Sequence, residues 1–305
     1  MKKDGEKVTT VLKETRRRAE ILFASVTVAR STSFVFAKIG LASFGVFSLL
    51  GIRFLIAFLI LAVIFHRRML QIDGKTFLLG TAMGVMLFAV MSAEFAALTT
   101  VSASETSLIE NMAIIFIPLF EAFLLRRRPG RISMVCAAVA FIGVIFLTLK
   151  DGFGFALSTG EIFCFAAALA FSFSLILNQR CTQKADPLLL GIVQVGVMGV
   201  LAQICAFLFE MPFLPDTGTD WFIVLYLAVV CTCFGFTFQP LAQKYMTSER
   251  AGLLSALNPL CAAVFSMIFL KENLGVFGFI GAFLILAAIM IPTVWDSIAA
   301  ARERT

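Results

Sequence analysis

Polar and ionisable side chains interrupt several long apolar runs of this 305-residue sequence. Arg30 and Arg53 each lie about ten residues inside such a run, which is near mid-depth for a membrane span of about 20 residues. Glu94 lies toward the end of a third run, and Glu110 and Asn111 lie within a fourth. A buried guanidinium is suited to bind an anion, and a buried carboxyl group is suited to pair with it or to carry a proton. These residues therefore predict ion recognition inside an apolar medium.

Composition fixes the class of protein. Hydrophobic residues make up 60% of the chain and charged residues only 14%, whereas soluble proteins are about 45–50% apolar and about 25% charged. We therefore predict an all-α integral membrane protein whose surroundings are a lipid bilayer. The net charge of +6 is then a matter of loop placement, and it predicts no nucleic-acid partner.

Apolar runs separated by charged, glycine- or proline-containing segments predict ten transmembrane helices. With approximate boundaries, they are 20–38, 43–65, 76–98, 104–125, 132–149, 157–178, 187–209, 220–243, 251–270 and 275–295. With a cytoplasmic N-terminus, 20 of the 25 lysines and arginines fall on the cytoplasmic side and three on the other. This bias predicts that both termini, as tails 1–19 and 296–305, are cytoplasmic. Segment 1–19 is too polar for a cleaved signal peptide, and the sequence fits a bacterial cytoplasmic membrane.

Two of the runs resemble each other. Segment 106–130 superposes on segment 251–275 without a gap, at an offset of 145 residues, and their hydropathy matches better than their letters. We interpret this as a duplication with repeats 20–150 and 157–295. Because five spans is an odd number, the second repeat enters the membrane from the opposite side, which gives an inverted repeat with a site near mid-membrane. The alternative is that the likeness reflects apolar composition alone.

The candidate site residues come from both repeats. The candidate substrate-binding residues are Arg30, Arg53, Glu110, Asn111, Gln194 and Asn258, and the candidate coupling or ion-pairing residues are Glu94, Glu110 and Glu121. Glu121 follows Glu110 by eleven residues, so a continuous helix would place the two within about 20° of one face. Alternatively, the arginines and glutamates neutralise one another as internal ties, and Gln194 and Asn258 make interhelical hydrogen bonds.

Signatures of enzymes and cofactors are missing. Gly74-Lys75-Thr76 resembles the end of a phosphate-binding loop, but Met69 stands where the earlier glycine is required. His66 is the single histidine, and the seven cysteines lie in or beside apolar runs without metal-type spacing. We therefore predict no enzyme, no cofactor, no metal and no ATP-driven engine. An intramembrane enzyme using Glu94 and Glu110 is the alternative.

Several motifs resemble the drug/metabolite transporter superfamily, in its ten-span form with two EamA-type domains. The likeness rests on Ser33–Lys38 in the first span, Arg53–Ala57 in the second, the small residues from Ser102 leading to Pro118, and Asn258-Pro259 through Glu272 to Gly281. It covers about residues 20–295. Two departures are that Arg30-Ser31-Thr32 stands where the family often has a tryptophan, and that Pro118 lies four residues later than Pro259 would predict.

The resemblance implies a secondary transporter that moves a small solute across the membrane by alternating access. Our interpretation is export of an amino-acid-like or carboxylated metabolite, with possible coupling to protons, because two mid-depth arginines favour an anionic cargo. The alternatives are an exchanger or importer of a phosphorylated or drug-like solute, and, outside transport, a membrane scaffold or sensor. The sequence gives no oligomeric state.

Overall fold

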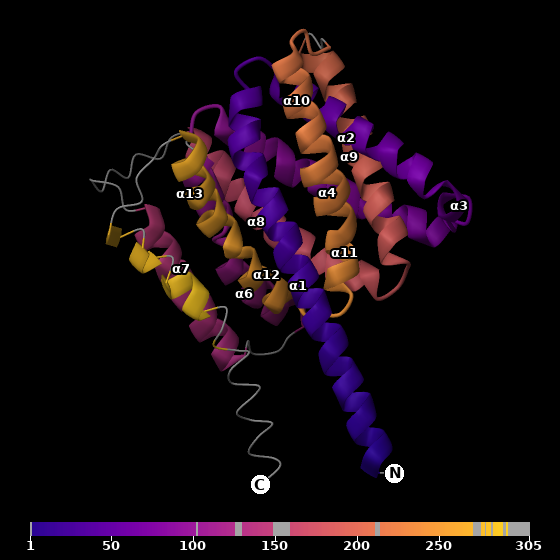
Figure 1. The fold of residues 1–305 in the computed structure, drawn as a ribbon, viewed down its shortest axis with the longest axis vertical. Helices are drawn as coiled ribbons and strands as arrows, with labels where there is room; N and C mark the ends of the chain where they lie inside the picture. The colour runs from indigo at the N-terminus through magenta and orange to yellow at the C-terminus, as the bar shows by residue number, and fades with distance from the viewer. Residues whose placement is uncertain are drawn as a thin grey trace.

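The computed structural model describes residues 2–101, 103–125, 130–148, 159–210 and 214–270, and short pieces between 276 and 291. Helices form almost all of this part of the chain, and it contains no strand (Figure 1). The helices are α1 Lys2–Gly40, α2 Val46–Ile64, α3 His66–Met69, α4 Gly74–Leu98, α5 Ala103–Glu110, α6 Ala113–Leu125, α7 Arg131–Thr148, α8 Thr159–Thr182, α9 Pro187–Phe209, α10 Gly218–Tyr226, the π-helix η1 Leu227–Phe236, α11 Thr237–Gln243, α12 Ser248–Ser255 and α13 Leu257–Leu270.

Seven helical segments of the described residues are long and apolar enough to cross a membrane. They are Glu14–Gly40, Val46–Ile64, Gly74–Leu98, Thr159–Thr182, Pro187–Phe209, Gly218–Gln243 and Ser248–Phe269. Three shorter apolar helices, Ala113–Phe123, Met134–Gly143 and Phe279–Ala288, coincide with the remaining expected spans. The chain is therefore an all-helical integral membrane protein, and the count of ten spans stays a prediction. Arg126–Arg128, Lys150, the motif residue Glu272 and the tail 296–305 lie outside the described residues.

The first helix starts well before the predicted span. α1 begins at Lys2 and projects from the bundle as the long indigo helix of Figure 1. Salt bridges one helical turn apart, Arg18–Glu14 at 2.6 Å and Arg16–Glu20 at 3.3 Å, support this polar part, because opposite charges at i and i+4 stabilise a helix. We call the end of the bundle from which α1 projects the N-terminal end.

Two of the expected spans are interrupted helices. The fourth is split into α5 and α6, with turns at Asn111 and Met112, and the ninth into α12 and α13, with a turn at Ala256. α5 packs against α13, and α6 packs against α12, so the two broken helices run in opposite directions beside each other. Asn111 and Ala256 are 145 residues apart, which is the offset at which the two segments superpose in the sequence. This correspondence favours the inverted repeat.

The two interruptions have different local causes. Pro259 lies in the first turn of α13, where it lacks the N–H that would bond the carbonyl of Ser255 in a continuous helix. No proline stands at the other break, and Pro118 lies inside α6. There the side-chain amide of Asn111 donates to the Ser107 carbonyl at 2.7 Å, and the N–H of Met112 turns to the carbonyl three residues earlier, Ile109, at 3.0 Å.

Small residues let the central helices approach closely. A Cβ on Gly80 or Gly84 of α4 would lie less than 3.0 Å from Val193 or Val197 of α9. Gly80 and Gly84, four residues apart, therefore form a packing surface for α9. α9 also packs against α2, and α4 packs against α8, so α2, α4, α8 and α9 form a connected framework.

Polar contacts tie helix ends together at the end of the bundle opposite the N-terminal end. The ammonium of Lys38 on α1 donates to the carbonyls of Leu98 and Val101, where α4 has unsatisfied acceptors. The carboxylate of Glu210, at the end of α9, accepts from the N–H groups of Phe47 and Ser48 at 2.9 and 2.8 Å. Glu210 therefore caps the N-terminus of α2 from a distant part of the chain.

Candidate functional site

Arg30 lies at the contact between α1 and the second half of the chain. Its Nη1 donates to Oε1 of Gln239 on α11 at 2.8 Å, and its guanidinium carbon lies 4.2 Å from the centre of the Phe236 ring. A Cβ on Gly235 would lie 2.7 Å from Cγ of Arg30, so the glycine leaves room for the arginine. Aromatic faces stabilise a buried cation without neutralising it, so Arg30 keeps its charge available.

Arg53 is the largest fully buried side chain of the described residues. Its Nε donates to Thr232 of η1 at 3.2 Å and its Nη1 donates to Ser33 of α1 at 3.1 Å. Both acceptors are neutral hydroxyls, and Nη2 has no hydrogen-bond partner among the residues that the structure describes. A buried charged donor without a partner is costly and is typical of a binding site.

Two carboxyl groups lie close to these arginines. Glu94 on α4 and Glu110 at the end of α5 are 3% and 1% exposed. Their side chains lie within hydrogen-bonding range of each other, and both interact electrostatically with Arg30. Among the described residues, no N–H or hydroxyl group donates to either carboxyl oxygen of Glu110. The structure thus brings together Arg30, Arg53, Glu94 and Glu110, which we call the central charge cluster.

The π-helix positions part of this cluster. In η1 the hydroxyl of Thr232 donates to the carbonyl of Leu227, five residues earlier, at 2.9 Å, and the same hydroxyl accepts from Arg53. Interruptions of this kind are common at functional sites because they redirect side chains and free backbone groups. Cys231 of the same helix lies 3.4 Å from the hydroxyl of Thr32 on α1.

Gln194 has a defined structural partner. Its side-chain amide donates to the Phe236 carbonyl at 2.6 Å. Pro240 lies four residues after Phe236 and has no N–H to offer this carbonyl. Gln194 supplies the missing donor across the contact between α9 and α11, which is the interhelical hydrogen bond that the sequence left open as an alternative.

Asn111 and Asn258 lie at the two helix interruptions. Asn111 directly follows α5, and Asn258 is in the first turn of α13, the helix that packs against α5. Both are buried, and in the described part of the chain the side-chain oxygen of each has no hydrogen-bond partner. The hydroxyl of Ser107, one turn before Asn111, likewise has no partner within the described ranges. The breaks therefore carry several buried polar atoms with unused hydrogen-bonding capacity.

Glu121 lies apart from the central charge cluster. Its neighbours are Ser248 and Glu249 of α12 and Arg180 of α8, and it is only partly buried. The continuous helix that the shared face of Glu121 and Glu110 requires is interrupted, because α5 ends at Glu110 and α6 begins at Ala113. The break between the two helices changes the angular relation on which the expectation rested.

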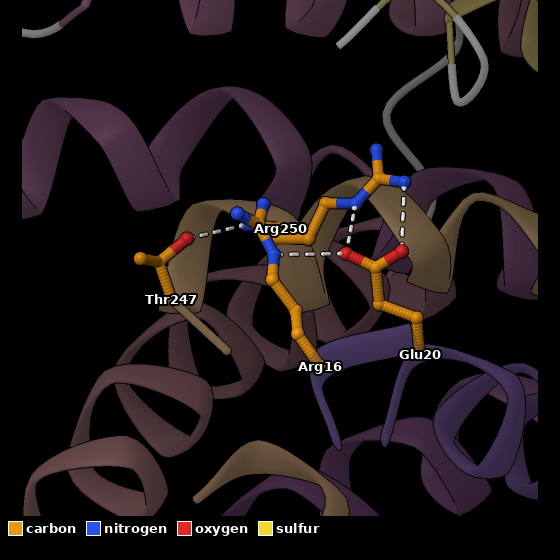
Figure 2. Close-up of polar contacts among 4 residues, drawn as sticks. All are labelled: Arg16, Glu20, Thr247 and Arg250. Carbon is orange, nitrogen blue, oxygen red and sulfur yellow. Dashed lines mark hydrogen bonds and ion pairs between the residues drawn. The ribbon is translucent and has the colours of Figure 1, made fainter. Parts of the chain in front are cut away.

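A second group of charged residues lies at the N-terminal end of the bundle (Figure 2). Arg250 of α12 donates from Nε and Nη2 to the two oxygens of Glu20 at 3.1 and 3.2 Å, and Arg16 donates to the same carboxylate at 3.3 Å. The hydroxyl of Thr247 accepts from the backbone N–H of Arg250 and so caps α12. We call Arg16, Glu20 and Arg250 the terminal ion-pair cluster; it joins α1 to α12.

The sequence did not select Gln239, Thr232 or Ser33 as site residues. Each is buried and contacts one of the two arginines. Gln239 stands beside Pro240, and Thr232 stands between Cys231 and Cys233. A polar residue beside a helix-interrupting proline is a signal that could have identified Gln239, whereas the position of Thr232 depends on the π-helix.

Comparison with known proteins supports the resemblance. The model of the EamA-like transporter family matches residues 17–149 and 158–293. A protein of Archaeoglobus fulgidus described as an uncharacterized transporter is 25% identical, over 90% of this chain and 86% of its own. The uncharacterized transporter YetK of Bacillus subtilis is 23% identical, over 98% of this chain and 95% of its own.

The fold also matches a solved structure. One crystal structure of a protein superposes with a TM-score of 0.75 at 20% identity, covering 92% of this chain and 97% of that one. At this level of identity the match concerns the fold alone. The family model matches both halves of the sequence, and this shows that the chain belongs to the EamA-like transporter family.

Proposed function

We propose that this membrane transporter exports a small carboxylated metabolite, either amino-acid-like or a simple carboxylate, by alternating access. The observation that carries the proposal is the Nη2 of Arg53, a buried cationic donor that has no hydrogen-bond partner among the described residues and interacts electrostatically with Arg30. Arginine suits the binding of a carboxylate because its planar N–H groups match two carboxylate oxygens. In this proposal the solute carboxylate is the missing acceptor.

The location of the cluster supports a transport role. Arg30 and Arg53 come from α1 and α2, and their partners Gln239 and Thr232 come from α11 and η1 in the second family match. A site between two repeats is exposed to alternate sides when the repeats rock against each other. The two broken helices supply further polar atoms, as in transporters whose discontinuous helices line the site. By the bias of basic residues, the N-terminal end of the bundle faces the cytoplasm of the host cell.

Solute counterflow with purified protein in liposomes tests this proposal. Liposomes are preloaded with one unlabelled candidate, and uptake of the labelled candidate is followed, with simple carboxylates, neutral amino acids and sugar phosphates run in parallel. We expect accumulation of a carboxylated solute. Arg53→Lys keeps the charge but loses the planar fork, so we expect accumulation to fall about tenfold or more.

Arg68→Lys is the matched control, because Arg68 is 61% exposed and its ion pair with Asp186, at 4.0 Å, is long and weak. It should transport like the unchanged protein. Selective transport of sugar phosphates alone would overturn the substrate class, and no flux of any solute by folded protein would overturn metabolite transport. Unchanged transport by Arg53→Lys would remove Arg53 from the binding site.

A further inference from the structure

The Glu94–Glu110 pair is the part of the central charge cluster that the carboxylate proposal leaves unexplained. Two ionised carboxylates repel each other, and a hydrogen bond between carboxyl groups requires a proton on one of them. Glu110 receives no hydrogen bond from any N–H or hydroxyl group among the described residues, although it is 1% exposed. The simplest partner that satisfies both carboxyl groups is a single shared proton.

The neighbouring helices supply the other charges of the pair's environment. The ionisable groups that interact with Glu94 or Glu110 in the described part of the chain are Arg30 of α1, Arg53 of α2, Cys164 of α8 and Cys231 of η1. A thiol has an ordinary pKa of about 8.5 and is uncharged near neutral pH, and arginine stays charged throughout. Two positive charges therefore face two carboxyl groups whose combined charge depends on one proton.

This charge count links the proton to the solute. With both carboxylates ionised the cluster is neutral, and adding a monovalent anion alone gives a net charge of minus one. With one shared proton the cluster has a net charge of plus one, and the same anion brings it back to zero. A net charge buried away from water is costly. The two neutral states, empty without the proton and occupied with it, are therefore favoured over the two charged states.

We infer that the Glu94–Glu110 pair binds one proton together with one monovalent carboxylate solute, and that both cross the membrane in the same step. This inference rests on the proposed function, and it narrows the solute to one with a single net negative charge. The proton is accounted for as follows. One carboxylate of the pair takes a proton from water on the side where the solute binds and returns it to water on the side where the solute is released. Transport of proton and anion together moves no net charge.

Proteoliposomes containing a pH-sensitive dye test this inference with the solute that counterflow identifies. An inward gradient of the solute should acidify the lumen by one proton per solute, after subtraction of the signal from protein-free liposomes. The apparent affinity should fall by up to about tenfold per pH unit over the range in which the pair loses its proton, as expected for one linked proton.

Glu110→Gln separates the inference from a structural role. A glutamine is uncharged and can donate to Glu94 as the proton-bearing carboxyl would, so the cluster stays at plus one. We expect the pH dependence of counterflow and the lumen acidification under a solute gradient both to be lost, whatever the change in the rate of counterflow itself. Glu94→Gln should behave in the same way and serves if the first variant does not fold. Glu121→Gln is the matched control, because Glu121 lies apart from the cluster, and it should keep the coupling of the unchanged protein.

The outcomes are distinguishable. Absence of counterflow in the folded, unchanged protein would contradict the proposed function. If the unchanged protein shows counterflow but a solute gradient does not acidify the lumen, only the proton-coupled step is contradicted. Acidification that persists in Glu110→Gln would contradict the same step. Preferred transport of a zwitterion without proton movement would also overturn it, since the ammonium group of the solute would then be the partner of Glu110.

Discussion

Two clusters of arginine and glutamate in this molecule use the same chemistry in opposite ways. In the terminal ion-pair cluster, Glu20 accepts from Arg250 and Arg16 through both of its oxygens (Figure 2). In the central charge cluster, no hydrogen bond joins either arginine to a carboxylate among the described residues; Arg53 keeps a free Nη2, and Glu110 receives no N–H or hydroxyl donor. The first is satisfied at an edge of the bundle, and the second is unsatisfied in its interior.

The difference shows how to tell a structural charge from one held for a ligand. Oppositely charged groups that serve only as ties should contact each other, because an unpaired buried charge destabilises the fold. The central arginines instead contact hydroxyls, an amide and aromatic rings, which hold them in place without a direct hydrogen bond to a carboxylate. This arrangement favours ligand binding over the alternative of internal ties.

The largest effect on stability is expected at the terminal ion-pair cluster. Arg250→Gln removes two charge-assisted hydrogen bonds from Glu20, so we expect the free energy of unfolding to fall by about 2 kcal/mol. Thermal unfolding in detergent measures this change. Arg68→Gln, at an exposed residue, should change stability by less than about 0.5 kcal/mol. An equal loss in both variants would show that the terminal cluster is no stronger than a surface pair.

Removing a charge from the central charge cluster should raise the free energy of unfolding, the opposite of the effect at the terminal ion-pair cluster. Glu110→Gln removes a buried carboxylate that receives no N–H or hydroxyl donor from the described residues, so we expect a gain in stability of about 1 kcal/mol. The gain should increase with pH, because the unchanged pair loses its proton as the pH rises. Unfolding scans across pH measure it. A loss of stability comparable to that of Arg250→Gln would mean that Glu110 is a structural tie, and the contrast between the clusters would fail.

The smallest effect concerns the placement of Arg30. In Gly235→Ala the new Cβ would lie 2.7 Å from Cγ of Arg30, which forces the arginine off its preferred conformation. At about 0.5–1.5 kcal/mol for such a displacement, solute affinity should fall roughly two- to tenfold in counterflow. Gly218→Ala is the control, since no described residue lies within 4 Å of a Cβ there. Unchanged affinity in Gly235→Ala would argue that Arg30 does not contact the solute.

Several features of the fold could be predicted because local physics determines them. The seventh predicted span, 187–209, coincides with α9, since Asp186 caps the helix and Pro187 is suited to its first turn. Burial of Arg30 and Arg53 followed from their depth in apolar runs. The break after Glu110 could not be predicted, because no proline or glycine stands at Asn111 or Met112 and a side-chain contact shapes the turn.

The contacts between spans could not be predicted from the sequence, for another reason. Apolar runs specify that helices cross a bilayer but leave the rotation of each helix about its axis open, since packing against neighbours sets it. The pairing of Arg30 with Gln239 and of Arg53 with Thr232 depends on that rotation and on the π-helix. The same limit explains why Gln194 was placed among candidate binding residues although its amide satisfies the Phe236 carbonyl.

The cap that Glu210 provides has a consequence for how the protein is made. It is 163 residues from Phe47, whose N–H it accepts, and a Cβ on Gly45 would occupy the position of its carboxylate. At synthesis rates of about 5–20 residues per second, α2 exists for roughly 10–30 seconds before Glu210 is added to the chain. During that interval water or lipid headgroups must satisfy the first N–H groups of α2. The final docking of α2 therefore waits for the second half of the chain to emerge from the ribosome.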